Sequence, residues 1–89
     1  MKRYVITSFA RTPAGAFLGD LKEVPVQDLA SLTIKEAVSR SGITAQEVQG
    51  VVLGHVMGTP EAANIARFAL LQAGLDEETP GYTVNRICG

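Results

Sequence analysis

Cys88 is the residue in this chain with the clearest capacity for covalent chemistry. A cysteine becomes a good nucleophile when its thiolate is stabilised, and unpaired backbone N–H groups at the start of a helix favour that negative charge. Cys88 and Gly89 follow a segment expected to be a strand, so a sharp turn from strand to helix can present the thiol, with Gly89 as the small neighbour. A lone cysteine near a strand end is, however, also commonly a small buried hydrophobe. The residue type and its place leave both interpretations open.

Three further residues with polar or polarisable side chains lie near the C-terminal ends of segments expected to be strands. His55 could relay protons because histidine titrates near neutrality, but a structural role is the simpler interpretation. Met57 can line a pocket or simply pack, and Asn85 can position the nucleophile or be an ordinary strand residue. Four carboxylates could suggest a metal site, and they are Glu61, Asp76, Glu77 and Glu78. Their spacing is not that of a calcium loop, and no cluster of His or Cys accompanies them as in a zinc site. We therefore predict no metal and no cofactor site in this segment.

Alternating strand and helix patterns must hold these residues in place. The predicted elements are a strand over 4–9, a helix with Pro25 as its first residue and Gly42 as its stop, a strand over 51–57, a helix over 62–73 and a strand over 82–87. Thr59 and Pro60 are expected to open the second helix, and Thr44 to Glu47 has capping-box spacing for a short turn. Such alternation predicts an α/β fold with a parallel sheet, in which His55, Met57 and Cys88 gather at the carboxyl ends of strands.

Composition excludes several functional classes. The formal net charge is −1 and the eight Lys and Arg residues are scattered, which argues against a nucleic-acid partner. A single cysteine fits a reducing compartment, and no apolar run is long enough to span a bilayer, so a cytoplasmic location without membrane attachment is expected. The apolar run Val51 to Leu53 is typical of a strand buried on both faces, and the helix over 62–73 is apolar almost all round. These 89 residues cannot cover both, so we expect a continuation or a partner chain to complete the fold.

Four ordered blocks of the sequence resemble the thiolase family. Asn85 to Gly89 resembles the nucleophile motif, in which Asn, two variable residues, Cys and Gly are followed by Ser-Gly. The other three blocks are Arg11-Thr12-Pro13 with Gly15 and Phe17, the run 51–56 that usually ends in Gly-x-Val, and Asn64 to Arg67 followed by Ala73-Gly74. The family often has Gln before this Asn, whereas this chain has Ala63. The resemblance covers essentially the whole chain, and the blocks are specific only when taken together.

The resemblance implies a fold, an activity and a set of partners. Residues 1–89 would be a βαβαβ part of a thiolase-fold N-terminal domain, a helix-covered mixed sheet that is incomplete on its own and ends at the nucleophile turn. Cys88 would take an acetyl group from acetyl-CoA as a thioester, and its backbone N–H would help to form the oxyanion hole. Two acetyl-CoA would thus give acetoacetyl-CoA plus CoA, as in fatty-acid metabolism. The activating His, the second Cys and the coenzyme A contacts would come from a missing or partner segment beginning near Ser-Gly.

The resemblance also suggests roles for supporting residues. The nucleophile strand of the family pairs across a dimer axis, so Asn85 would position Cys88 or serve that contact in a dimer or tetramer. Asn64 and Arg67 would have structural roles, with the arginine in an ion pair or on a carbonyl. Two alternatives to the biosynthetic enzyme stay open: a degradative 3-ketoacyl-CoA thiolase, and a non-catalytic structural fragment or subunit.

Overall fold

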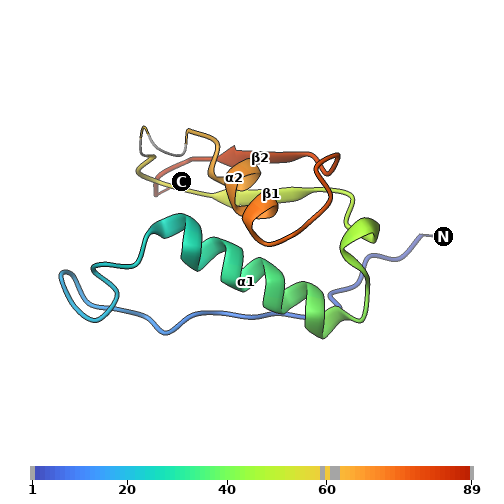
Figure 1. Ribbon diagram of the computed structural model, residues 1–89, viewed down its shortest axis with the longest axis horizontal. Helices are drawn as coiled ribbons and strands as arrows, with labels where there is room; N and C mark the ends of the chain where they lie inside the picture. Colours follow the sequence, from blue (N-terminus) through green and yellow to red (C-terminus); the bar gives the residue numbers. More distant parts are fainter. Residues whose placement is uncertain (1, 59, 61–62, 89) are drawn as a thin grey trace.

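The computed structural model describes residues 2–58, 60 and 63–88 of the 89-residue chain (Figure 1). In chain order the elements are α1 (Val26–Ser41), the short 3-10 helix η1 (Ala45–Glu47), β1 (Val51–Gly54), α2 (Ile65–Gln72) and β2 (Gly81–Val84). Helices and strands therefore alternate from α1 onward, which confirms the predicted α/β class. Among the described residues, no helix combines the length and hydrophobicity needed to cross a bilayer.

The ends of α1 follow from local backbone chemistry. The Pro25 carbonyl accepts the N–H groups of Asp28 and Leu29, so Pro25 is the N-cap rather than the first helical residue that the sequence suggested. The helix stops at Gly42, whose φ of +81° lies in the left-handed region that glycine adopts without a Cβ penalty. After it, Glu47 reaches back to the Thr44 N–H at 2.9 Å, and the predicted capping box forms around η1.

The two strands form a parallel sheet. Val51 pairs with Gly81 and Gly54 pairs with Val84, and α2 provides the crossover between the two strands. The predicted parallel arrangement is thus confirmed for this pair. The strands are shorter than expected, since β1 ends at Gly54 rather than near Met57 and β2 ends at Val84 rather than at Ile87.

The core lies where α2 packs on this sheet. Among the described residues, the buried apolar side chains all come from α2 and the turn after it, and they are Ile65, Ala66, Ala69, Leu70 and Leu75. Helix and strand approach closely at Gly81, where a Cβ atom would lie 2.5 Å from Leu70 Cδ2. α1 packs on α2 in turn, and it lies below the sheet in Figure 1. Asn64 is the N-cap of α2, whereas the expected cap Thr59 lies outside the described residues.

The opposite face of the sheet is open in the described part of the chain, which agrees with the expectation that these residues cannot cover both faces of the strand at Val51 to Leu53. Val52 is 54% exposed, and Tyr82, its neighbour in the register, is 59% exposed. The side chains of a strand alternate between the two faces, and α2 covers only the face of Val51 and Leu53. The continuous apolar run therefore indicates a strand whose two faces are both suited to burial, and the described residues cover one of these faces.

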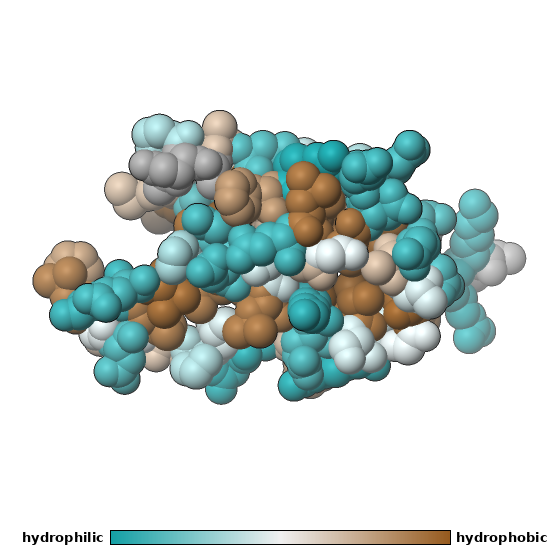
Figure 2. Space-filling view, in the orientation of Figure 1, coloured by the Kyte–Doolittle hydropathy of each residue, from teal (hydrophilic) through white to brown (hydrophobic). Residues whose placement is uncertain are grey.

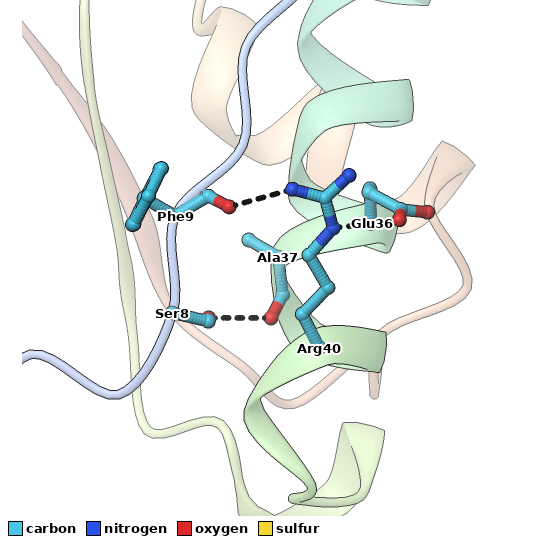
Figure 3. A network of polar contacts seen from close by, with 5 residues as sticks. All are labelled: Ser8, Phe9, Glu36, Ala37 and Arg40. Atoms are coloured by element: carbon cyan, nitrogen blue, oxygen red, sulfur yellow. Dashed lines mark hydrogen bonds and ion pairs between the residues drawn. The ribbon is translucent and has the colours of Figure 1, made fainter.

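The N-terminal segment is not the strand that its residues suggested. Residues 4–9 are extended and run along α1 on the side away from the sheet (Figure 1). Side-chain contacts attach the segment to the helix: the Ser8 hydroxyl donates to the Ala37 carbonyl at 2.7 Å, and the Arg40 guanidinium donates to the Phe9 carbonyl at 3.1 Å (Figure 3). A strand needs a neighbouring strand to complete its backbone hydrogen bonds, and a helix cannot supply that ladder. The predicted βαβαβ order is therefore wrong at its first strand.

The molecule exposes more surface than a closed domain of its size. Its accessible area is 7114 Å², compared with roughly 5000 Å² expected for a folded monomer of this mass. Its radius of gyration is 13.9 Å, against about 12 Å expected for a compact chain of this length. Figure 2 shows apolar side chains at the surface between the sheet and α1, and at the tip of the loop that precedes α1. These values agree with the prediction of an α/β fold that is incomplete on its own.

Candidate functional site

The candidate site lies at the carboxyl edge of the sheet. Because β1 and β2 are parallel, the residues that follow Gly54 and those that follow Val84 leave the sheet at the same edge. In Figure 1 the C-terminal end of the chain and the loop after β1 lie at the same end of the molecule. The structure thus brings Met57 and Cys88 to one edge, as the strand pattern indicated.

Cys88 is a free, exposed thiol in a turn just beyond β2. None of the described residues buries the Cys88 side chain. Exposure is what a nucleophile requires, since the sulfur must reach a substrate carbonyl. Gly89, the predicted small neighbour, lies outside the described residues.

The residue before the thiol has an unusual backbone conformation. Ile87 has a φ of +52°, in the left-handed region, although it is β-branched. For such a residue this conformation costs about 1–2 kcal/mol, so the surrounding contacts must hold it. Strain of this kind is found preferentially at functional sites. Nothing in the sequence pattern indicated it.

Asn85 makes the contacts that fix this turn. Its Nδ2 donates to the Val56 carbonyl at 2.8 Å, and its Oδ1 accepts the Ile87 N–H at 2.8 Å. One amide side chain therefore joins the segment after β1 to the turn that carries the thiol. The sequence indicated Asn85 as a supporting residue, but neither of its two partners.

His55 and Met57 differ in their surroundings. The His55 N–H donates to the Val84 carbonyl at 3.0 Å, which continues the strand pairing. The histidine also lines a hollow of about 210 Å³ together with residues of α1 such as Thr33, and Cys88 does not line that hollow. Met57 is 79% exposed and lies beside the Val56 carbonyl that Asn85 binds. The contacts of His55 match the structural role that the sequence favoured.

A second polar cluster ties α2 to β2. Asn64 Oδ1 accepts the Arg67 N–H at 3.4 Å and the Thr83 hydroxyl at 2.8 Å, while its Nδ2 donates to the Gly81 carbonyl at 3.1 Å. Arg67 donates to the Thr79 carbonyl at 3.0 Å, so it binds a carbonyl as expected. Ala63 is exposed, and the missing glutamine amide leaves no buried gap. This cluster ties the start of α2 to β2.

The carboxylates at 76–78 form part of a surface turn. Asp76 accepts the Glu78 N–H at 2.9 Å with its side chain and the Thr79 N–H at 2.9 Å with its carbonyl. Within residues 2–58, 60 and 63–88, no three His, Cys, Asp or Glu residues are grouped as metal ligands would be. Glu61 lies outside the described residues.

Comparisons with known proteins show what the chain is similar to. The family profile described as "Thiolase, N-terminal domain" matches residues 4–89. A protein of Staphylococcus aureus named "Probable acetyl-CoA acyltransferase" is 37% identical over all 89 residues, which make up 23% of its length. The "Acetyl-CoA acetyltransferase" of Paracoccus denitrificans is 38% identical over the same span, again 23% of its length.

A solved structure shows the same fold. The crystal structure of the Bacillus anthracis acetyl-CoA acetyltransferase superimposes with a TM-score of 0.91 and 44% sequence identity, covering 94% of this chain and 21% of that one. The chain thus spans about a quarter of the length of the relatives it matches. Because the family profile covers nearly all of its residues, the chain belongs to the thiolase family and matches that family's N-terminal domain.

Proposed function

We propose that Cys88 is the acyl-accepting nucleophile of a thiolase that condenses two acetyl-CoA molecules into acetoacetyl-CoA and CoA. The observation that carries the proposal is an exposed thiol at the carboxyl edge of the parallel sheet, in a chain whose match to the thiolase N-terminal domain runs from residue 4 to residue 89. The relatives named above act on acetyl-CoA according to their names.

In the first half-reaction the Cys88 thiolate attacks the thioester carbonyl of acetyl-CoA. A carbon–sulfur bond to Cys88 forms, the bond to coenzyme A sulfur breaks, and CoA leaves as a thiolate that takes up a proton. The oxyanion that forms in between needs donors, and the Cys88 backbone N–H would be one of them.

In the second half-reaction the acetyl group leaves Cys88. A second acetyl-CoA loses an α-proton to a base, its α-carbon attacks the acetyl-Cys88 carbonyl, and the thiolate is released as the carbon–carbon bond forms. That base, the group that activates Cys88 and the coenzyme A contacts are proposed to come from the remainder of the thiolase. We propose that the complete protein is a cytoplasmic dimer or tetramer with no further cofactor, because coenzyme A arrives with the substrate.

Pre-steady-state release of CoA tests the proposal. Mixing the complete protein with acetyl-CoA should release a burst of about one CoA per Cys88, before the slower condensation. In a Cys88→Ala variant the burst should disappear. A full burst in that variant would show that another group accepts the acetyl unit.

The acyl chain length is a separate question, because one relative is named an acyltransferase and others acetyltransferases. The alternative is therefore a degradative thiolase that cleaves longer 3-ketoacyl-CoA. Rates of thiolytic cleavage with acetoacetyl-CoA and with a C8 or C10 3-ketoacyl-CoA separate the two. Faster cleavage of the longer substrates would favour the degradative enzyme over the one proposed.

A further inference from the structure

We propose that Asn85 is a positioning residue that holds the Cys88 turn in its reactive geometry by bridging the two strand ends. The proposal rests on the proposed function of Cys88 and assigns to a neighbouring side chain the task of orienting it. Asn85 itself need not touch the substrate.

Both polar atoms of the Asn85 side-chain amide form hydrogen bonds. The donor Nδ2 binds the Val56 carbonyl and the acceptor Oδ1 binds the Ile87 N–H, each at 2.8 Å. An amide that is bonded at both ends cannot rotate without losing a hydrogen bond, so its orientation is fixed. Val56 belongs to the segment after β1 and is 29 positions away from Asn85. The turn after β2 is thereby tied to a second element of the same sheet edge.

The turn needs such a restraint because of Ile87. This β-branched residue lies between Asn85 and Cys88 with a φ of +52°, which an unrestrained chain seldom adopts. The bond from its N–H to Asn85 Oδ1 is the contact that bears directly on that conformation. Without it, rotation about the Ile87 backbone would redirect both the Cys88 N–H and the Cys88 side chain.

The direction of these two groups matters for the chemistry. The substrate carbonyl must meet the sulfur and an oxyanion-hole donor at once, and a misplacement of about 1 Å can reduce the rate on the order of a hundredfold. Stability alone explains these contacts less well, because Asn85 is exposed and water could satisfy its amide. Asn64 is exposed too, but its three hydrogen bonds join the start of α2, the helix that supplies most of the core, to β2.

The test compares Asn85→Ala with Asn64→Ala as a matched control in the complete protein. Both substitutions remove an asparagine that makes side-chain-to-backbone hydrogen bonds, but only the first touches the Cys88 turn. For Asn85→Ala we expect the burst rate of CoA release to fall by about tenfold to a hundredfold. The KM for acetyl-CoA should stay within about twofold of the parent value, because Asn85 orients Cys88 and does not bind the substrate. Asn64→Ala should lower thermal stability at least as much and keep the burst rate within about threefold.

Two results would overturn the proposal. One is an Asn85→Ala burst rate within about twofold of the parent, and the other is an equal loss of rate in both variants, which would reflect general destabilisation. If the parent itself releases no burst, the proposed function of Cys88 fails, whereas a parent burst that Asn85→Ala leaves unchanged rejects only the role of Asn85. The two failures are therefore distinguishable.

Hydrogen exchange in the parent protein gives a readout that does not depend on how the variants fold. The Ile87 amide is expected to exchange at least about tenfold more slowly than in an unstructured peptide, since Asn85 accepts its proton. Exchange at the unstructured rate would show that the bond is not maintained, and would reject the proposal even if neither variant could be purified.

Discussion

Two segments of similar composition adopt different structures in this molecule. Residues 4–9 and strand β1 are both rich in β-branched or aromatic side chains, yet only β1 belongs to a sheet. β1 has a parallel partner in β2 and the cover of α2. The N-terminal segment has α1 beside it, and Tyr4 and Ile6 are 93% and 90% exposed.

The difference shows that strand propensity needs a neighbouring strand to act on. β-propensity describes how well side chains suit a pleated, partly buried surface, and it supplies no hydrogen-bond partner. The region that carries Cys88 is the one in which helix, strand and polar cluster support one another. Substitutions in the two segments and their supports should therefore differ in effect, and those that disturb the core under the sheet should cost the most.

Leu70→Ala should destabilise the sheet region most. Leu70 is fully buried between α2 and β2, and removing such a side chain leaves a cavity that costs about 2–5 kcal/mol. Amide exchange at Val51–Gly54 in the complete protein measures the loss. The matched control is Leu32→Ala, because Leu32 is 60% exposed on α1 and should change exchange little. Equal effects of the two substitutions would contradict the account of where the core lies.

Gly81→Ala should have the next largest effect. The added Cβ would lie 2.5 Å from Leu70 Cδ2 and 3.3 Å from the Ala66 backbone, so α2 and β2 must move apart, at a cost of about 1–3 kcal/mol. Gly54→Ala is the control in the partner strand, where nothing lies within 4 Å of the position that the added methyl group would take. Circular dichroism melts should show a lower Tm for the first variant and nearly the parent value for the second. The reverse order would contradict the close approach at Gly81.

Arg40→Ala should loosen only the N-terminal segment and leave the sheet unchanged. It removes the bond to the Phe9 carbonyl and an exposed ion pair with Glu36, which together contribute about 0.2–1 kcal/mol. We expect limited proteolysis within residues 4–13 to accelerate, while exchange in β1 and β2 stays unchanged. Slower proteolysis, or a change in the sheet, would show that the segment is held by contacts other than these.

The smallest expected effect is a pH response of the turn between the two regions. Hydrogen bonds from the Thr44 backbone N–H and hydroxyl lower the pKa of Glu47 below its ordinary value of 4.5. Because the pKa of Glu47 is lower in the folded state, the ionised carboxylate stabilises the fold. This contribution to the free energy of unfolding is complete above pH 4.5 and is lost as the pH falls through the folded-state pKa. Thr44 amide exchange, corrected for intrinsic rates, should therefore accelerate in that range, and Glu47→Gln should weaken this pH dependence. An unchanged pH response in the variant would assign the effect to another group.

Sequence reasoning recovered the elements whose signals are local. The stop of α1 at Gly42 and the short turn at Thr44 to Glu47 depend on a few adjacent residues, and the structure confirms both. Whether residues 4–9 form a strand depends on which surfaces meet, and periodicity does not encode that. At the site, the motif indicated Cys88 and Asn85. It did not indicate the Ile87 conformation or the Val56 contact, because these arise only when two loops meet at one sheet edge.

The most direct test of the central claim is to locate the acetyl group itself. The complete protein is mixed with acetyl-CoA, quenched with acid within milliseconds and digested, and the peptide containing Cys88 is weighed by mass spectrometry. We predict that this peptide gains one acetyl group that hydroxylamine removes, as a thioester requires, and that the Cys88→Ala protein carries no such group. A protein that turns over substrate while Cys88 stays unmodified, with the acetyl group on another residue, would contradict the account.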